Sequence, residues 1–204
     1  DASTGLFERT LLSYGGFVDY NFDSKYLFTS SLRYDQSSVF GRENRGGAFW
    51  STSAAWNLAK EDFMEGLPFD DLKLRASAGV SGNQAGIGSY ESLAVIGFGS
   101  FNSQSTAAPT DNGNPDLKFE ENYTYDIGLE FTMFDDRLRG AFDYYKKVTS
   151  DLLLDKPLLS LGGEPDGSIL SNVGEMVNKG IELELDYDVI RSNDLYVNVS
   201  ATFG

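Results

Sequence analysis

The chain of 204 residues carries a formal net charge of −15 and contains neither cysteine nor histidine. Those two absences argue against disulfides, thiolate metal sites and histidine-based catalysis, and the acidic balance argues against a nucleic-acid-binding surface. The 22 glycines, 11 tyrosines and 15 phenylalanines favour strands joined by tight turns.

Apolar and polar residues alternate along most of the chain, which is typical of strands with one apolar and one polar face. About eight strands can be placed, each of roughly 9–13 residues, the length that a tilted strand needs to cross a membrane. In chain order we expect them at 10–22, 26–35, 48–58, 72–81, 123–133, 138–147, 181–189 and 195–203. No segment approaches the roughly 20 consecutive apolar residues of a transmembrane helix.

Charged residues in these strands fall almost wholly on the polar face, with Lys146 as the exception. A half-buried soluble sheet would alternate in the same way, so the alternation alone leaves two architectures open. One is an antiparallel transmembrane β-barrel. The other is a soluble β-sandwich that serves as a carbohydrate-binding or adhesin module.

The connections between strands favour the barrel. Short turns near 23–25, 135–137 and 190–194 alternate with long connections at 36–46, 82–122 and 148–179. Outer-membrane barrels have short periplasmic turns and long outer loops. Segment 59–71 departs from this pattern, because it lies on the short-turn side and is expected to hold a helical turn. Aromatic residues also gather at strand ends on the apolar face, as in interfacial girdles.

Five blocks of sequence carry a family resemblance. They occur in one order along the chain, and they are YLFTSSLRYDQSSVFG at 26–41, LKLRASAGVSGNQ at 72–84, NPDLKFE at 114–120, DYYKKVTSDLL at 143–153 and NVGEMVNKGIEL at 172–183. These blocks resemble the barrel of SusC/RagA-like TonB-linked (TonB-dependent) outer-membrane transporters. The resemblance covers nearly the whole chain and agrees with the strand assignment at every block.

The resemblance implies an all-β fold, namely about eight strands of a larger barrel of the 22-stranded type. Residues 1–204 would then be a partial barrel domain, without the plug domain or the TonB-contacting segment. The implied function is TonB-dependent uptake of oligosaccharides or peptides across the outer membrane. The implied partners are a SusD-like lipoprotein, the TonB-ExbB-ExbD complex reached through another part of the chain, the cargo and outer-membrane lipid.

The long connection 82–122 is the best candidate for cargo contact. Aromatic rings can stack on sugars or grip a peptide, and amides can hydrogen-bond to either. We therefore predict ligand contacts from four residues of this connection, which are Tyr90, Phe98, Phe101 and Asn102. The competing interpretation is that the loop packs on its neighbours.

Two further sites can be considered. The oxygen-bearing residues Asp111, Asn112, Asn114 and Asp116 lack the spacing of a calcium-binding loop, and a polar turn explains them better. The acidic row at 182–188 includes Glu184 and Asp186, which could act as a glycosidase pair, but strand alternation already explains the row. We accordingly predict no enzyme activity, no catalytic residue, no metal site and no cofactor.

Overall fold

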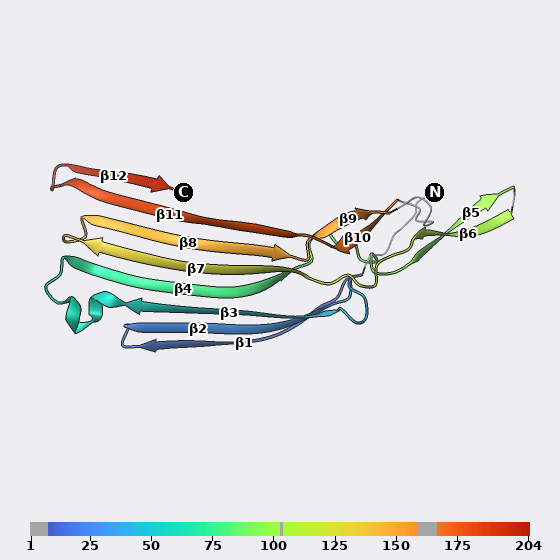
Figure 1. The fold of residues 1–204 in the computed structure, drawn as a ribbon, viewed down its shortest axis with the longest axis horizontal. Coiled ribbons are helices and arrows are strands. Elements are labelled where there is room, and N and C mark those ends of the chain that lie inside the picture. The colour runs from blue at the N-terminus through green and yellow to red at the C-terminus, as the bar shows by residue number, and fades with distance from the viewer. Residues whose placement is uncertain (1–7, 103, 159–166) are drawn as a thin grey trace.

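A computed structural model describes residues 8–102, 104–158 and 167–204. Its main feature is one antiparallel sheet of eight strands, called the wall below, in the order β1-β2-β3-β4-β7-β8-β11-β12. Figure 1 shows these strands running side by side, with short turns at one end and longer connections at the other. The strands are β1 (Leu11–Phe22), β2 (Tyr26–Ser37), β3 (Gly46–Asn57), β4 (Phe69–Asn83), β7 (Glu120–Met133), β8 (Leu138–Ser150), β11 (Glu175–Arg191) and β12 (Tyr196–Phe203).

The predicted eight strands are thus confirmed, and their register explains why the two faces differ. Residues opposite each other in an antiparallel pair share a face, so alternation extends from one strand to the next. Ala76 lies opposite Ile127 on the apolar face, whereas Ser77 lies opposite Asp126 on the polar face. The three-residue connection 23–25 between β1 and β2 places Asp23 in the left-handed region, with a φ of 54°, as the central positions of a type I′ turn require.

Several strands extend further than the alternation predicts. β8 continues to Ser150 and β11 begins at Glu175, so the long connection between them is shorter than 148–179. The expected helical turn in 59–71 is present as two 3₁₀ turns, η1 (Leu58–Lys60) and η2 (Asp62–Met64).

The two longest connections each contain a hairpin that the sequence does not predict. β5 (Val95–Phe101) pairs with β6 (Gln104–Asp111), and β9 (Leu153–Pro157) pairs with β10 (Ser168–Asn172). Figure 1 shows both hairpins beyond the end of the wall that carries the long connections, with β5 and β6 extending furthest. We call this end the outer end.

The wall is a single layer within the described residues. Its edge strands are β1 and β12, and the remaining strands form only the two hairpins, so no second sheet covers the apolar face. Large apolar side chains on that face are exposed, including Val18 at 60% and Leu32 at 61%. This arrangement differs from the β-sandwich alternative, in which the two apolar faces would pack together. None of the described helices is long and apolar enough to cross a membrane.

Candidate functional site

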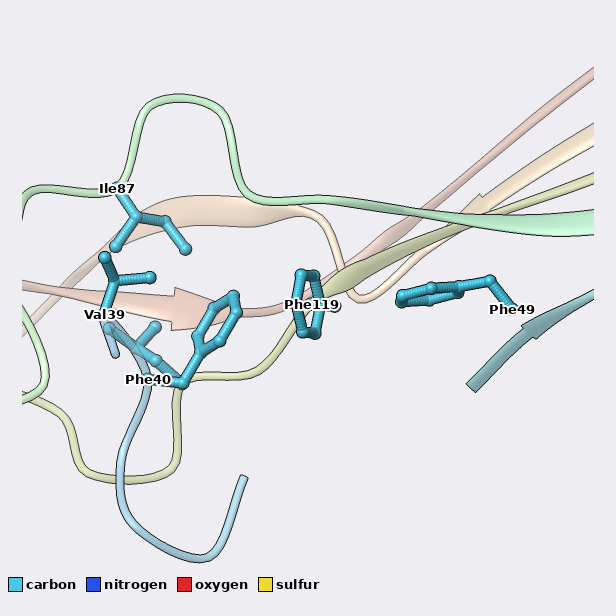
Figure 2. Packing of buried hydrophobic residues seen from close by; sticks show 6 residues of the cluster. Val39, Phe40, Phe49, Ile87 and Phe119 are labelled. Carbon is cyan, nitrogen blue, oxygen red and sulfur yellow. The ribbon is translucent and has the colours of Figure 1, made fainter. Parts of the chain in front are cut away.

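Buried apolar side chains gather at the outer end of the wall, where three connections meet. Figure 2 shows the rings of Phe40, Phe49 and Phe119 in a row. The centroids of Phe40 and Phe119 are 4.5 Å apart, and those of Phe49 and Phe119 are 5.3 Å apart in an edge-on arrangement. We call this cluster the rim core, and its members are Val39, Phe40, Phe49, Ile87, Leu117 and Phe119.

The rim core holds the connections in fixed positions. Its Phe40 and Leu117 are fully buried and come from connections that are far apart in the sequence. Gly41 permits this contact, because a Cβ atom there would overlap the backbone carbonyl of Pro115. Only a residue without a side chain allows the two backbones to approach so closely.

Two asparagine side chains beside the rim core form hydrogen bonds between the connections. Asn172 accepts a hydrogen bond from the backbone N–H of Lys118 at 2.9 Å and donates to the carbonyls of Lys118 and Asp151. Asn114 donates to the carbonyl of Leu170 at 2.8 Å. These bonds tie the hairpin of β9 and β10 to the segment that leads into β7, so the two long connections form one rim.

The β5–β6 hairpin is attached to this rim at its base. The backbone N–H of Asn114 donates to the carbonyl of Glu91 at 2.8 Å. Gly113 has a φ of +62° and lies so close to the backbone of Leu93 that a side chain would not fit. Burial raises the pKa of Glu91, and neighbouring carboxylates add to the rise. Beyond this base, β6 is exposed from Gln104 to Thr110.

The structure spreads the four predicted ligand residues along this hairpin. Tyr90 lies in the turns at the base, and Phe98 lies in β5 with 86% of its surface exposed. Asn102 forms the tip, in the left-handed region with a φ of 50°. Phe98 and Asn102 are about 13 Å apart along the chain, because a strand rises about 3.3 Å per residue. The backbone of Phe101 belongs to β5, but its side chain lies outside the described part.

The segment 111–116 makes turns, as the simpler interpretation predicts. Asp111 accepts a hydrogen bond from the N–H of Gly113 at 2.8 Å, and Asn114 accepts one from the N–H of Asp116 at 3.0 Å. Such local bonds are typical of Asx turns. Within the described ranges, no group of three or more acidic residues is arranged to hold a metal ion.

An ion-pair network crosses three strands on the polar face of the wall. Arg75 lies within 3.2 Å of Asp126, 2.9 Å of Glu130 and 2.5 Å of Asp143. The guanidinium reaches Asp143 on β8 by passing over Gly128 on β7, which lies between them in register. The missing side chain of Gly128 therefore leaves the space that this network occupies.

The acidic row on β11 is also engaged in a polar network. Asp186 lies 2.5 Å from Arg139 and accepts a hydrogen bond from Asn198 at 2.8 Å. Asp188 also accepts bonds from Asn198 and Arg139. Glu184 lies opposite Ala141 and has no such partner among the described contacts. Asp186 is therefore an acceptor in a network that joins β8, β11 and β12.

One surface hollow on the polar face is lined by residues that the sequence does not indicate as candidates for a binding site. It has a volume of about 390 Å³ and includes Phe17, Arg33 and Phe49 in its lining. Phe17 is 77% exposed although it lies on the polar face. Arg33 stacks over the Phe49 ring with its central carbon 5.8 Å from the centroid. The sequence does contain a signal for this hollow, because Phe17 and Phe49 are aromatic residues at strand positions where the alternation predicts a polar residue.

A different cluster marks the opposite end of the wall, on the apolar face. Phe22, Tyr26 and Trp56 form a stacked row, with centroids 6.4 and 6.3 Å apart. Glu61, between the two 3₁₀ turns, accepts hydrogen bonds from the Tyr26 hydroxyl at 2.7 Å and the Trp56 indole at 2.9 Å. These two bonds, followed by one from Lys25, lower the pKa of Glu61 to about 2. Rings with one polar end are typical of an aromatic girdle at a membrane surface.

Comparison with known proteins agrees with this geometry. The family described as TonB dependent receptor-like, beta-barrel, matches residues 5–204. TonB-dependent receptor P3 of Formosa agariphila is 37% identical over 98% of this chain, and the match covers 20% of that protein. TonB-dependent receptor SusC of Bacteroides thetaiotaomicron is 33% identical over 94% of this chain and 20% of its own length. The chain thus spans about one fifth of the length of these relatives.

Solved structures match the wall as well. The RagAB peptide importer in its open-open state matches with a TM-score of 0.86 and 31% identity, over 95% of this chain and 21% of that one. The siderophore receptor PirA of Acinetobacter baumannii shares the fold alone, with a TM-score of 0.61 and 14% identity. The chain therefore belongs to the TonB-dependent receptor β-barrel family, and its wall is part of an outer-membrane barrel similar to those of SusC and RagA.

Proposed function

We propose that this chain forms part of the barrel of a transporter that imports oligosaccharides or peptides across the outer membrane with energy from TonB. The observation that carries the proposal is the agreement of sequence and fold with the RagAB peptide importer, at 31% identity and a TM-score of 0.86. Membership of a fold family does not select a cargo, which is chosen by particular side chains. Residues 1–204 would serve as a partial barrel domain, and the plug and TonB-contacting segment would lie elsewhere in the parent chain.

The proposed cargo contacts lie at the outer end, on the β5–β6 hairpin. Phe98 offers an uncovered ring, and Asn102 offers an amide at the hairpin tip. Tyr90 and Phe101 complete the proposed set. Because the hairpin is fixed at its base and exposed beyond it, it can present these groups without rearrangement of the rim core.

The proposed partners follow from the same relatives. They are a SusD-like lipoprotein at the cell surface and the TonB-ExbB-ExbD complex, which would engage a part of the protein outside residues 1–204. We further propose that the chain has no enzyme activity. The support for this is that the matched family and relatives are TonB-dependent receptors.

Uptake of labelled cargo by cells that carry the full parent chain tests the proposal. We expect accumulation of either a peptide pool or an oligosaccharide pool, and loss of accumulation when TonB is inactivated. Accumulation that is unaffected by TonB, or the absence of uptake of both pools by a correctly inserted barrel, would contradict it. The cargo class that accumulates distinguishes the two forms of the proposal.

Variants of the hairpin test the proposed contacts. Phe98→Ala removes the exposed ring, and Asn102→Gly removes the amide while tolerating the positive φ. Gln104→Ala is the matched control, because Gln104 is exposed near the same tip. We expect both test variants to weaken uptake roughly ten-fold, which is the loss of one good contact of about 1.4 kcal/mol. Equal uptake by all three variants would place cargo recognition elsewhere in the barrel.

A further inference from the structure

Two lysines lie directly opposite each other on the face of the wall that meets lipid. Lys146 on β8 pairs with Lys179 on β11, and the next pair on the same face is Tyr144 with Ile181. Both lysines are exposed. Neither forms a salt bridge within the described ranges. The alternation of apolar and polar residues does not place Lys179 in a strand, because β11 begins at Glu175, several residues before its apolar run starts at Ile181.

This arrangement is unfavourable unless something neutralises it. Directly opposed residues on an antiparallel pair have Cβ atoms about 4.5–5.5 Å apart, and like charges at that spacing repel. A lysine on the lipid-facing side of a barrel is also destabilising in proportion to its depth in the membrane. Two such residues side by side therefore call for an anion that is not part of the described chain.

The depth of the pair indicates what that anion is. Lys146 is eight residues beyond Leu138, which opens β8 at the inner end, so it lies about 27 Å along the strand. At the usual tilt of 35–45°, this distance becomes about 20 Å of height in an apolar band about 25 Å tall. Flexible lysine stems then carry the ammonium groups to the outer boundary of the hydrocarbon.

The neighbours of the pair fit that boundary. Tyr125 lies opposite Lys146 on its other side, and both Tyr125 and Tyr144 are more than two-fifths exposed. On the three strands β7, β8 and β11, the carboxylates of this face come only further out. Glu121 and Glu175 both lie opposite Ser150, four residues and about 13 Å beyond Lys146. The lysines thus occupy the level between apolar side chains and the outer carboxylates.

We propose that Lys146 and Lys179, flanked by Tyr125 and Tyr144, bind the anionic phosphate of a lipid headgroup in the outer leaflet. Two ammonium groups can donate charge-assisted hydrogen bonds to the phosphate oxygens. The tyrosine rings lie where interfacial aromatic residues contact the headgroup region. The apolar surface below the pair would accept the acyl chains of the same lipid.

The test uses the full parent chain in detergent micelles, to which phosphorylated lipid A is added, with bound lipid measured by native mass spectrometry. The double variant Lys146→Gln and Lys179→Gln removes both charges. Lys147→Gln is the matched control, because Lys147 is exposed at the same height on the opposite face. The charge-keeping variant Lys146→Arg and Lys179→Arg tests whether positive charge is the feature required. Heat-modifiable migration on a gel confirms that each variant retains its barrel.

We expect the double Gln variant to bind phosphorylated lipid A about 30-fold more weakly, which corresponds to about 2 kcal/mol for two basic side chains. The Lys147→Gln and double Arg variants should bind phosphorylated lipid A as tightly as the original protein does. The original protein should bind dephosphorylated lipid A weakly, with an affinity no higher than that of the double Gln variant for phosphorylated lipid A. Equal affinity of the original and the double Gln protein would overturn the proposal, as would an equal loss in Lys147→Gln. If millimolar inorganic phosphate displaces the lipid, the site binds free phosphate, and the proposal that a lipid headgroup supplies the anion is wrong.

Discussion

Arg75 bonds to Asp143 across an intervening strand, with 2.5 Å between Nη2 and Oδ1. The strand between them contributes Gly128, whose missing side chain opens the passage. Inside a barrel, this bond joins β4, β7 and β8 on the lumen side, so it restrains the wall across more than one hydrogen-bonded pair.

Gly128→Ala should break that bridge, because a Cβ atom would collide with both Asp143 and the guanidinium of Arg75. We expect the unfolding free energy of the barrel to fall by about 1 kcal/mol, the scale of a partly exposed ion pair. The temperature at which the band shifts on an unboiled gel measures this loss. Gly16→Ala is the control, since nothing lies within 4 Å of a Cβ atom there. An equal shift in both variants would show that added bulk, and not the bridge, is responsible.

The carboxylate of Glu61 should make stability depend on acid pH. Its pKa is lowered from 4.5 to about 2 by bonds from Tyr26, Trp56 and Lys25. A lowered pKa stabilises the folded state above the unfolded value, and that stability is lost as the pH falls from about 4.5 towards 2. Asp62, the adjacent acidic residue, contributes no bond to this cluster among the described contacts.

Glu61→Gln should therefore unfold at a lower temperature than the original protein at pH 7, and the difference should shrink as the pH approaches 2. Thermal unfolding in detergent at a series of pH values measures this. Glu65→Gln, at an exposed position four residues later, provides the comparison. If the difference in unfolding temperature between the original protein and Glu61→Gln stays constant from pH 7 to pH 2, the carboxylate does not stabilise the aromatic row.

Phe40→Ala should loosen the rim while leaving the wall intact. Phe40 is fully buried and contacts Phe119, so the change removes about 3–5 kcal/mol of local stability. We expect faster protease cleavage within 84–119 in the inserted parent protein, together with unchanged heat-modifiable migration. Phe98→Ala should leave cleavage unchanged, because that ring is exposed. Loss of the barrel band in Phe40→Ala would show that rim and wall fold as one unit.

Asn172 offers a test of single hydrogen bonds. Asn172→Ala should leave the N–H of Lys118 without its acceptor and two carbonyls without a donor, at a cost of about 1–3 kcal/mol. Asn172→Asp keeps the acceptor and loses both donors. Hydrogen exchange should then show a fast Lys118 amide in the Ala variant and a protected one in the Asp variant. Equal exchange in the two would mean that the Lys118 amide is protected by something other than Asn172.

The wall could be predicted from the sequence because each strand has two different faces. Alternation around residues such as Ala76 and Ser77 fixes both the strand and its orientation. The alternation fails where Lys179 enters the apolar face of β11, so it predicts a strand that begins only at Ile181 instead of Glu175. The predicted strand 138–147 includes Lys146 but ends three residues before β8 does. The β5–β6 hairpin escaped prediction because its glycine, serine and alanine residues give no periodic contrast.

The rim was less predictable, because it depends on contacts between distant segments. Nothing local indicates that Phe40 meets Phe119, or that Gly41 lies against Pro115. The prediction of ligand residues rests on side-chain chemistry alone, which does not indicate how far apart they lie. The structure places Tyr90 at the hairpin base and Asn102 at its tip, so one compact ligand could not contact all of the predicted set at once.

The attachment of the β5–β6 hairpin at its base has a consequence for how such transporters diversify. Gly113 and Asn114 hold the ends of the hairpin together, and the residues beyond pair chiefly with each other. A hairpin of another length or composition can therefore replace it between the same two ends without disturbing the rim core. The proposed cargo-binding hairpin can therefore change its length or sequence without a change in the contacts that hold the rim core together.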